Sequence, residues 1–172
     1  MQIREPKITE KAEIMELFKT SIADAYKQNS INAPYDDQIK KQENWMNKHF
    51  NGEEESYYLV AIENDKIIGV MAFGEPKKIH IKHLGFSENT PLVRSAYVLQ
   101  EFQGMGIGSK LFKGLLNEMN RRDVKSFYID AGYRISQGYW KRRLGEPDVI
   151  LEKYYDNDDD MMLWKVAIDS LK

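Results

Sequence analysis

The hydrophobic positions of the chain follow a helical period through the first fifty residues. The chain begins with a short strand candidate, QIRE. Thr9 is then the predicted N-cap of a helix whose apolar residues recur at helical spacing: Ile14, Leu17, Phe18, Ile22 and Ala25. After the NSINAP break, a weaker and more polar stripe predicts a second helix: Ile39, Met46 and Phe50, with Trp45. Both helices are amphipathic, so each is expected to pack one face against other structure.

The period changes near residue 57. The runs YYLVAIE from Tyr57 and KIIGVMAFG from Lys66 are joined through NDK, a pattern typical of two antiparallel strands in a hairpin. The segment from Glu75 to Pro91 is irregular, and its KKIHIKH alternation predicts either an edge strand or a polar loop. His80 and His83 lie in that alternation and are expected at the surface.

Strands and helices alternate in the rest of the chain. LVRSAYV from Leu92 predicts a strand, and after a glycine turn comes a helix with one apolar face: Ile107, Leu111, Phe112, Leu115, Leu116 and Met119. KSFYIDA from Lys125 predicts a strand parallel to the previous one, if the helix between them is a right-handed crossover. SQGYWKRRLG predicts a short helix that Gly145 stops, and PDVILEKYY with MMLWKVAI predicts a closing antiparallel pair.

This order predicts an α/β fold with a mixed sheet of six to seven strands and helices on both faces, in a single domain over residues 1–172. A chain of this length can bury a core without disulfides or a structural metal. The absence of cysteine excludes a disulfide scaffold, thiol catalysis and cysteine-based zinc sites. The start, MQIREPKITE, has no signal-peptide core, and the run from Ile67 is far shorter than the roughly 20 residues that span a bilayer. We therefore expect a cytoplasmic protein that does not enter membranes.

The distribution of charged residues along the chain argues against a nucleic-acid partner and against a metal site. The 25 basic and 27 acidic residues are spread along the chain, so no nucleic-acid partner is expected. The cluster Lys141, Arg142 and Arg143 is interpreted as a solvated helix face. The acidic run DNDDD from Asp156 lacks the later glycine and glutamate of a calcium loop, so it predicts a polar hairpin tip and no metal site.

Three glycines, Gly104, Gly106 and Gly108, open the helix after the fourth strand. A P-loop is excluded because its lysine and hydroxyl spacing is absent. A dinucleotide fingerprint matches only in part, because Ser109 occupies its third glycine position. A tight strand-to-helix turn without ligand is the simplest alternative, although one glycine would suffice for it.

The longer string, Val98 to Gly108, resembles the acetyl-CoA-binding motif of the GNAT-superfamily N-acetyltransferases, V-x-x-x-x-(Q/R)-x-x-G-x-(G/A). Gln103, Gly106 and Gly108 fill its three diagnostic positions, and the order of strands and helices matches that family along nearly the whole chain. The resemblance implies a GNAT-like fold, acetyl-CoA as co-substrate without a metal, and acetyl transfer to a primary amine of a small molecule or peptide. Nothing in the sequence names the acceptor; by the same resemblance, the segment from Ala33 to Phe50 would help form its pocket.

Glycines suit a pyrophosphate because backbone N–H groups and the helix dipole can hold it only where side chains leave room. The expected donors are the amides of a short segment: Gln103, Gly104, Met105, Gly106, Ile107, Gly108 and Ser109. By resemblance to the family, Ala96, Tyr97 and Val98 would line the pantetheine arm between the fourth and fifth strands. The Val98 N–H would then donate to the thioester oxygen.

The groups that move protons are less well defined. The family often uses a Tyr to reprotonate the CoA thiolate, but Trp140 stands at that position, so Tyr139 is the substitute candidate unless solvent does the work. Candidates for deprotonating the amine are Asp130, Tyr97 and the pair Asp36 and Asp37.

The misplaced Tyr leaves an alternative function open, a non-catalytic acyl-CoA-binding sensor of the same fold. A homodimer through the terminal strands is a further open expectation.

Overall fold

The computed structural model describes residues 1–155 and 158–171 and forms two compact units. The first unit contains Met1–Gly74 and Arg94–Glu118, and the second contains Glu75–Val93 and Met119–Lys172. Seven strands follow the order β1-β2-β3-β4-β5-β7-β6, and both parallel and antiparallel pairs occur. The elements are β1 Gln2–Arg4, α1 Lys11–Gln28, α2 Asp36–Asn51, β2 Tyr57–Glu63, β3 Lys66–Gly74, α3 Lys78–Leu84, β4 Leu92–Val98, α4 Ile107–Arg121, β5 Ser126–Ala131, α5 Arg134–Leu144, β6 Val149–Leu151 and β7 Met161–Ala167. The mixed sheet with helices expected from the sequence is confirmed.

The β2–β3 hairpin organises the first unit. Its antiparallel register runs from Tyr57 opposite Phe73 to Glu63 opposite Lys66, and β1 pairs antiparallel with β2 on the other edge. Asn64 and Asp65 both have positive φ, 49° and 59°, as tight hairpin turns of the right twist require. The hairpin that the sequence predicts is therefore present.

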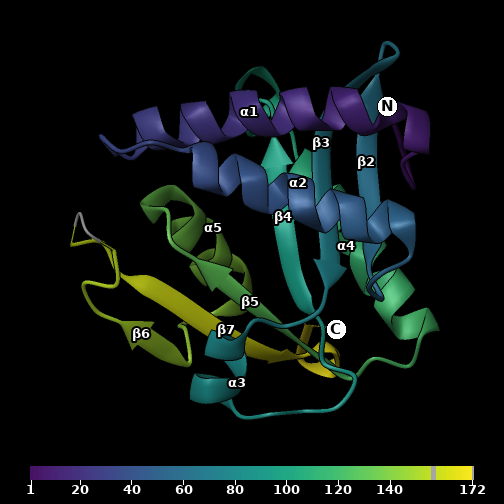
Figure 1. The fold of residues 1–172 in the computed structure, drawn as a ribbon. Coiled ribbons are helices and arrows are strands. Elements are labelled where there is room, and N and C mark those ends of the chain that lie inside the picture. The colour runs from purple at the N-terminus through teal and green to yellow at the C-terminus, as the bar shows by residue number, and fades with distance from the viewer. Residues whose placement is uncertain (156–157, 172) are drawn as a thin grey trace. The chain divides into compact units, whose positions relative to one another are not determined.

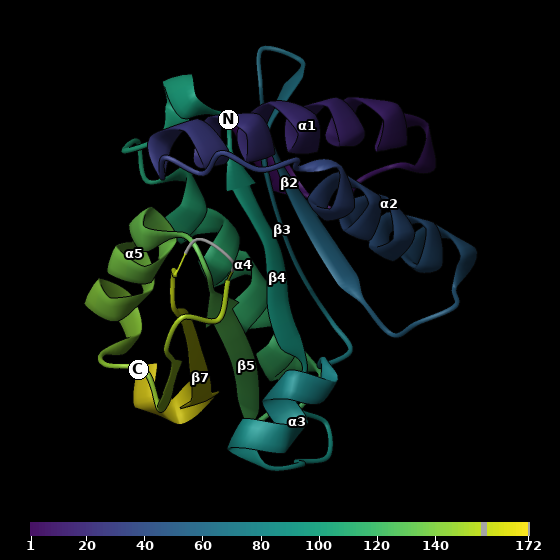
Figure 2. The same ribbon diagram turned by 60° about the vertical axis from the view of Figure 1, so that its left-hand side comes forward.

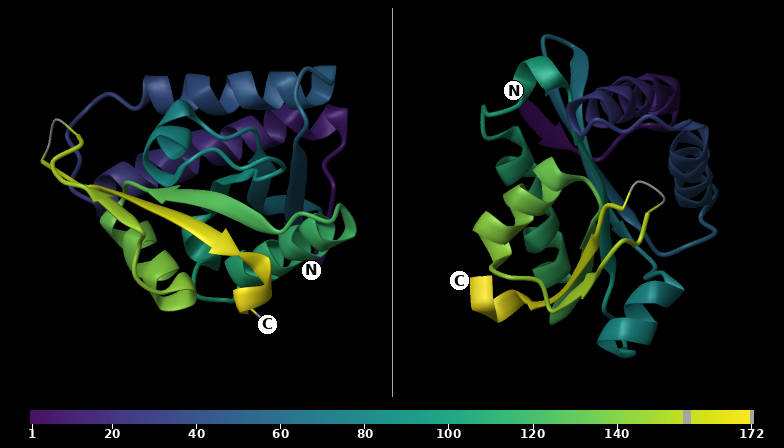
Figure 3. Two further views of the ribbon diagram at one scale, coloured as in Figure 1. Left: turned by 90° about the horizontal axis from the view of Figure 1, so that it is seen from below. Right: turned by 90° about the vertical axis from the view of Figure 1, so that its left-hand side faces the viewer.

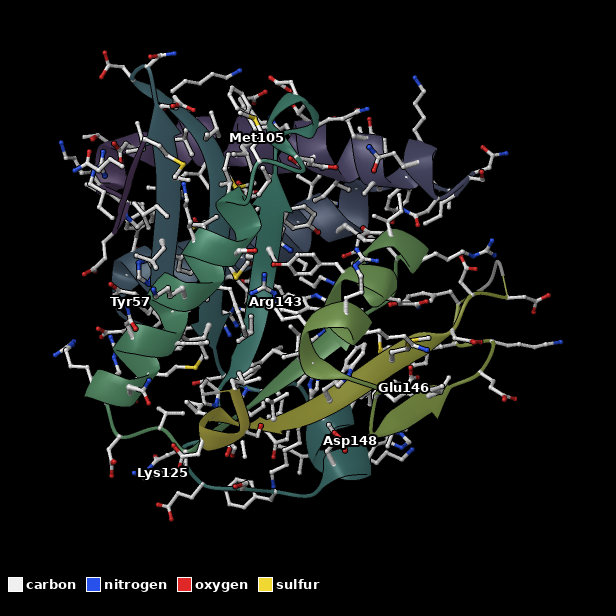
Figure 4. The ribbon with its side chains drawn as sticks, turned by 180° about the vertical axis from the view of Figure 1, so that it is seen from behind. Tyr57, Met105, Lys125, Arg143, Glu146 and Asp148 are labelled. Carbon is white, nitrogen blue, oxygen red and sulfur yellow. The ribbon has the colours of Figure 1, made fainter. Side chains whose placement is uncertain are left out.

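Helices cover both faces of this hairpin, which explains why β3 is buried at every position after its first. Figure 1 shows α1 and α2 side by side over one face, and Figure 4, from behind, shows α4 over the other. The helix α1 buries the apolar stripe found in the sequence, from Ile14 to Ile22. The helix α4 packs so closely that Ile107 and Leu111 lie against Gly69 of β3.

The second unit is built on β5 and β7. These strands pair antiparallel from Ser126 opposite Ala167 to Ala131 opposite Met162, and β6 pairs with the other edge of β7 (Figure 3, left). At its start, β4 pairs in parallel with β5 through two positions, Leu92 with Tyr128 and Val93 with Ile129. The helices α3 and α5 lie on opposite sides of β5 and β7 (Figure 2).

One element differs from the expectation. Residues 78–84 form the short helix α3, not an edge strand or a polar loop, and His80 within it is fully buried instead of lying at the surface. The alternation of isoleucines suggested a strand, but Ile81 points to solvent. The helix is fixed by long-range contacts of His80, described below, which a local pattern does not reveal.

Two further expectations concern the acidic run and insertion into a membrane. The acidic run begins at Asp156, and this residue and Asn157 lie outside the described residues. Among the residues that are described, no helix combines the length and apolar character needed to cross a membrane.

Candidate functional site

The glycine turn joins β4 to α4 in the first unit. A 3₁₀ turn over Gln100–Phe102 comes first, and Gly104 and Gly106 then adopt φ angles of 79° and 77°, a region that residues with a side chain rarely enter. A Cβ atom at either glycine would meet no heavy atom within 4 Å. The glycines are therefore required by the backbone path, and the space in front of them is open. Met105 between them is 61% exposed, and Figure 4 shows it at this end of α4.

Backbone N–H groups line this open space. The first helical hydrogen bond of α4 is donated by Lys110 to the Gly106 carbonyl, at 3.1 Å. Within residues 1–155 and 158–171, the amides of Gly104, Gly106, Ile107 and Gly108 make no backbone hydrogen bond, whereas Met105 closes the turn formed by Gln103 and Gly104. Such unpaired amides at the positive end of a helix dipole suit an anion. The Gln103 amide, predicted as a donor, is already bonded to the Gln100 carbonyl at 3.1 Å, so it is not available.

Gln103 acts through its side chain instead. Its Nε2 donates to the Val98 carbonyl at 3.0 Å and so ties the turn to the end of β4. The next residue, Leu99, donates its N–H to the Ile68 carbonyl of β3 at 3.0 Å. Since peptide groups of successive strand residues point to opposite edges, the Val98 N–H points away from β3. The Val98 N–H is therefore directed to the edge of β4 opposite β3, where it can donate to a ligand.

The predicted arm-binding residues of β4 differ in exposure. Ala96 is exposed, Tyr97 is half-buried with its ring edge-on to Phe18 of α1 at 5.6 Å, and Val98 packs against Gly69. The ring of Tyr97 is thus fixed by packing.

The carboxylates Asp36 and Asp37 occupy the first turn of α2 and are exposed. Negative charge at a helix N-terminus stabilises the helix, so a structural role explains both residues.

Asp130, the candidate base on β5, contacts two side chains in the second unit. Its Oδ2 lies 2.5 Å from Lys77 Nζ and 3.1 Å from His80 Nε2. The Lys77 N–H donates to His80 Nδ1 at 3.3 Å, so the remaining ring hydrogen is assigned to Nε2, facing Asp130. Burial alone would raise the pKa of the Asp130 carboxyl, but His80 and Lys77 outweigh it and hold the pKa well below its usual range. A carboxylate with so low a pKa accepts protons poorly near neutral pH.

Tyr139, the candidate acid on α5, has a hydroxyl that is buried yet has no hydrogen-bond partner within the described residues. Its ring packs edge-on against Trp140 at 4.8 Å, and the Arg143 guanidinium lies 5.2 Å from its centre. A buried hydroxyl without a partner is costly, by about 1–3 kcal/mol, so a polar group supplied by a ligand would stabilise it. Trp140, which stands where the family has its Tyr, is buried and forms part of the core.

No group of three or more histidine or acidic side chains in the described part of the chain could hold a metal ion.

Comparison with known proteins identifies the family. The sequence profile of the acetyltransferase (GNAT) family matches residues 18–145, most of the 172-residue chain. The protein therefore belongs to the acetyltransferase (GNAT) family, and the enzyme class expected from the sequence is confirmed. No curated protein sequence matches the chain significantly.

Solved structures share the fold at low sequence identity. A GNAT-family protein from Desulfovibrio desulfuricans superposes with a TM-score of 0.74 at 13% identity, covering 97% of this chain and 98% of the other. The PaiA N-acetyltransferase of Thermoplasma acidophilum, solved with coenzyme A, gives 0.69 at 14% identity, with 96% and 98% covered. YncA of Salmonella typhimurium, solved with acetyl-CoA, gives 0.68 at 19% identity, with 98% and 94% covered. At these identities the likeness establishes the fold.

Sequence reasoning missed the polar contacts that connect distant segments. His80 with Asp130, and Arg94 of β4 with Glu54 before β2, are separated by at least forty residues. Each pair joins elements whose proximity is known only once the fold is known, so no local pattern could have indicated them.

Proposed function

We propose that the protein transfers the acetyl group of acetyl-CoA to a primary amine of a small molecule or peptide by direct attack on the thioester. The observation that carries the proposal is the set of amides without a backbone acceptor at Gly104, Gly106, Ile107 and Gly108, on a backbone shaped by two left-handed glycines. Family membership and the CoA and acetyl-CoA bound to two structural neighbours support it. A single GNAT-like domain over residues 1–172, in the cytoplasm, is the accompanying proposal.

The amides of Gly104 to Gly108 and Ser109 would hold the pyrophosphate, and Ala96, Tyr97 and Val98 the pantetheine arm. The Val98 N–H would donate to the thioester oxygen as negative charge develops there, an interaction worth about 2.7–4 kcal/mol in comparable sites. The side-chain hydrogen bond of Gln103 would hold the end of β4 and the glycine turn in a fixed relative position.

Three proton transfers accompany the reaction. An alkyl ammonium with a pKa near 10.4 is neutral in about one molecule in 2,500 at pH 7, so the amine must lose a proton before its nitrogen attacks. The carbon–nitrogen bond then forms, the nitrogen loses its second proton, the carbon–sulfur bond breaks and the thiolate takes up a proton. Tyr139 is the proposed donor of that proton. The low pKa of Asp130 favours an anchoring role over proton abstraction, so we propose that the amine loses its first proton to bulk solvent before it attacks.

A thiol-release assay with acetyl-CoA and a panel of primary amines and amino-terminal peptides tests the proposal. Release of CoA that depends on one amine class, with acetylated product detected by mass spectrometry, is the expected result. The alternative of a non-catalytic sensor, which the displaced Tyr motivates, predicts acetyl-CoA binding by calorimetry with no turnover on any amine. A homodimer would appear as a doubled mass in analytical ultracentrifugation.

A further inference from the structure

Arg94 and Ser95 are neighbours in β4, yet both side chains contact α2. The Arg94 guanidinium lies over the Trp45 ring at 4.3 Å from its centre, and Ser95 Oγ donates to Gln42 Oε1 at 2.7 Å. Successive side chains of a regular strand point to opposite faces, so the alternation of β4 breaks at this point. Such a break is the mark of a β-bulge.

The backbone agrees with the side chains. Ser95 has a φ of 55°, in the left-handed region that residues with a side chain rarely occupy. It is also buried, with 5% of its surface exposed, so solvent does not relax it. A residue stays in such a conformation only where its surroundings hold it.

The bulge determines which face of the sheet each later side chain of β4 points to. After Ser95, Ala96 points to solvent, Tyr97 packs on Phe18 of α1, and Val98 packs against Gly69 on the α4 side. A strand that slips by one residue turns every side chain to the opposite face. With Ser95 in a regular extended conformation, Tyr97 and Val98 would exchange faces, and their peptide groups would exchange edges.

The hydrogen bond from Ser95 to Gln42 is a buried contact that holds the bulge. Gln42 is 3% exposed, so its bond to Ser95 is shielded from water. Trp45 lies three residues further along the same face of α2 and holds Arg94, whose guanidinium also pairs with Glu54. Side chains on one face of α2 therefore contact two successive residues of β4, Arg94 and Ser95.

We propose that Gln42 is a positioning residue for acetyl transfer. By holding Ser95 in its left-handed conformation, Gln42 orients Ala96 through Val98, the segment that would receive the pantetheine arm and the thioester oxygen. This inference rests on the proposed function and assigns to α2 a part in forming the acetyl-CoA site.

Glycine at position 95 provides the test, because glycine adopts a φ of 55° without help. Gln42→Leu removes the acceptor, and we expect its dissociation constant for acetyl-CoA to rise about tenfold. Ser95→Ala keeps the strained backbone without the bond and should weaken binding to a similar extent. Ser95→Gly should bind nearly as the unmodified protein does. The double variant Gln42→Leu with Ser95→Gly should recover most of the lost affinity, although it also lacks the bond.

Rescue by glycine separates positioning from a general loss of stability. If Gln42 only stabilised the fold, the double variant would bind no better than Gln42→Leu, and that result would overturn the proposal. Unchanged affinity in a folded Gln42→Leu protein would overturn it too. If Gln42→Leu does not fold, the two Ser95 variants provide the test. The proposal is then overturned if Ser95→Gly binds acetyl-CoA no more tightly than Ser95→Ala does.

A separate readout distinguishes this inference from the proposed function. The backbone chemical shifts of Ala96 to Val98 should move in ligand-free Gln42→Leu and return in the double variant. If the unmodified protein does not bind acetyl-CoA, the proposed function fails, whereas these shifts still report whether Gln42 sets the strand.

Discussion

Gln103 reaches back across the glycine turn and donates a hydrogen bond from Nε2 to the carbonyl of Val98, at 3.0 Å. The two residues are five positions apart, at opposite ends of the segment that links β4 to α4. This bond joins the proposed pyrophosphate cradle to the strand proposed to bind the thioester. The spacing between V and Q in the sequence motif thus has a direct structural cause in this protein.

Gln103→Glu should weaken acetyl-CoA binding by about tenfold or more, because a carboxylate cannot donate to the Val98 carbonyl and its charge opposes the pyrophosphate. Gln100→Glu is the matched control, since it adds the same charge in the preceding 3₁₀ turn at an exposed position. Calorimetry on both variants measures the difference. Equal losses would attribute the effect to charge alone and remove the hydrogen bond from the account.

Gly106→Val should reduce acetyl-CoA affinity at least tenfold, because valine strongly disfavours the φ of 77° that aims the amides. Gly52, which ends α2 with a φ of 69° and likewise has no atom near its missing Cβ, provides the control. Gly52→Val should lower the melting temperature to a similar degree and leave the affinity unchanged. A folded Gly106→Val protein with full affinity would contradict the placement of the pyrophosphate.

Tyr139→Phe should lower kcat by about one hundredfold if its hydroxyl protonates the thiolate, since general acids contribute roughly 10²–10⁴-fold. Affinity for acetyl-CoA should change little. Tyr154→Phe, at an exposed residue, should change neither quantity. Turnover equal to that of the unmodified enzyme would exclude Tyr139 from the mechanism and leave reprotonation to solvent.

Glu54→Gln should destabilise the first unit by about 3 kcal/mol or more, because it leaves the buried Arg94 charge without its partner. Asp123→Asn removes one partner of the exposed pair with Lys125 and should change the free energy of unfolding far less, because solvent screens that pair. Urea denaturation measures both. A loss at Glu54 no larger than that at Asp123 would show that the pair is solvated in solution.

The ion pair of Arg4 and Glu10 makes stability depend on pH. Arg4 donates to both carboxylate oxygens, at 2.9 Å and 2.6 Å, and lowers the pKa of Glu10 from 4.5 to about 2. A lowered pKa means that the contribution is complete above about pH 4.5 and is lost as the pH falls toward 2. The difference in unfolding free energy between the unmodified protein and Glu10→Gln should therefore be constant from pH 7 to 5 and shrink between pH 4.5 and 2. A difference independent of pH in that window would contradict the pairing.

The sequence predicts those parts of the fold that depend on local periodicity. The α1 stripe, the hairpin turn at Asn64 and Asp65, and the pairing of the last two strands are all found in the structure. Helix α3 was not predicted, because His80 is buried by its contact with Asp130, fifty residues away. The bulge at Ser95 was not predicted either, since it depends on Gln42, fifty-three residues away. Buried polar contacts between distant segments override local patterns.

The central claim is that the glycine turn binds the pyrophosphate of acetyl-CoA, and calorimetric titration of the unmodified protein with acetyl-CoA tests it most directly. The account predicts saturable binding of one acetyl-CoA per chain, with an affinity that falls in Gly106→Val and not in Gly52→Val. Absence of any binding heat together with an unchanged melting temperature at saturating acetyl-CoA would contradict it.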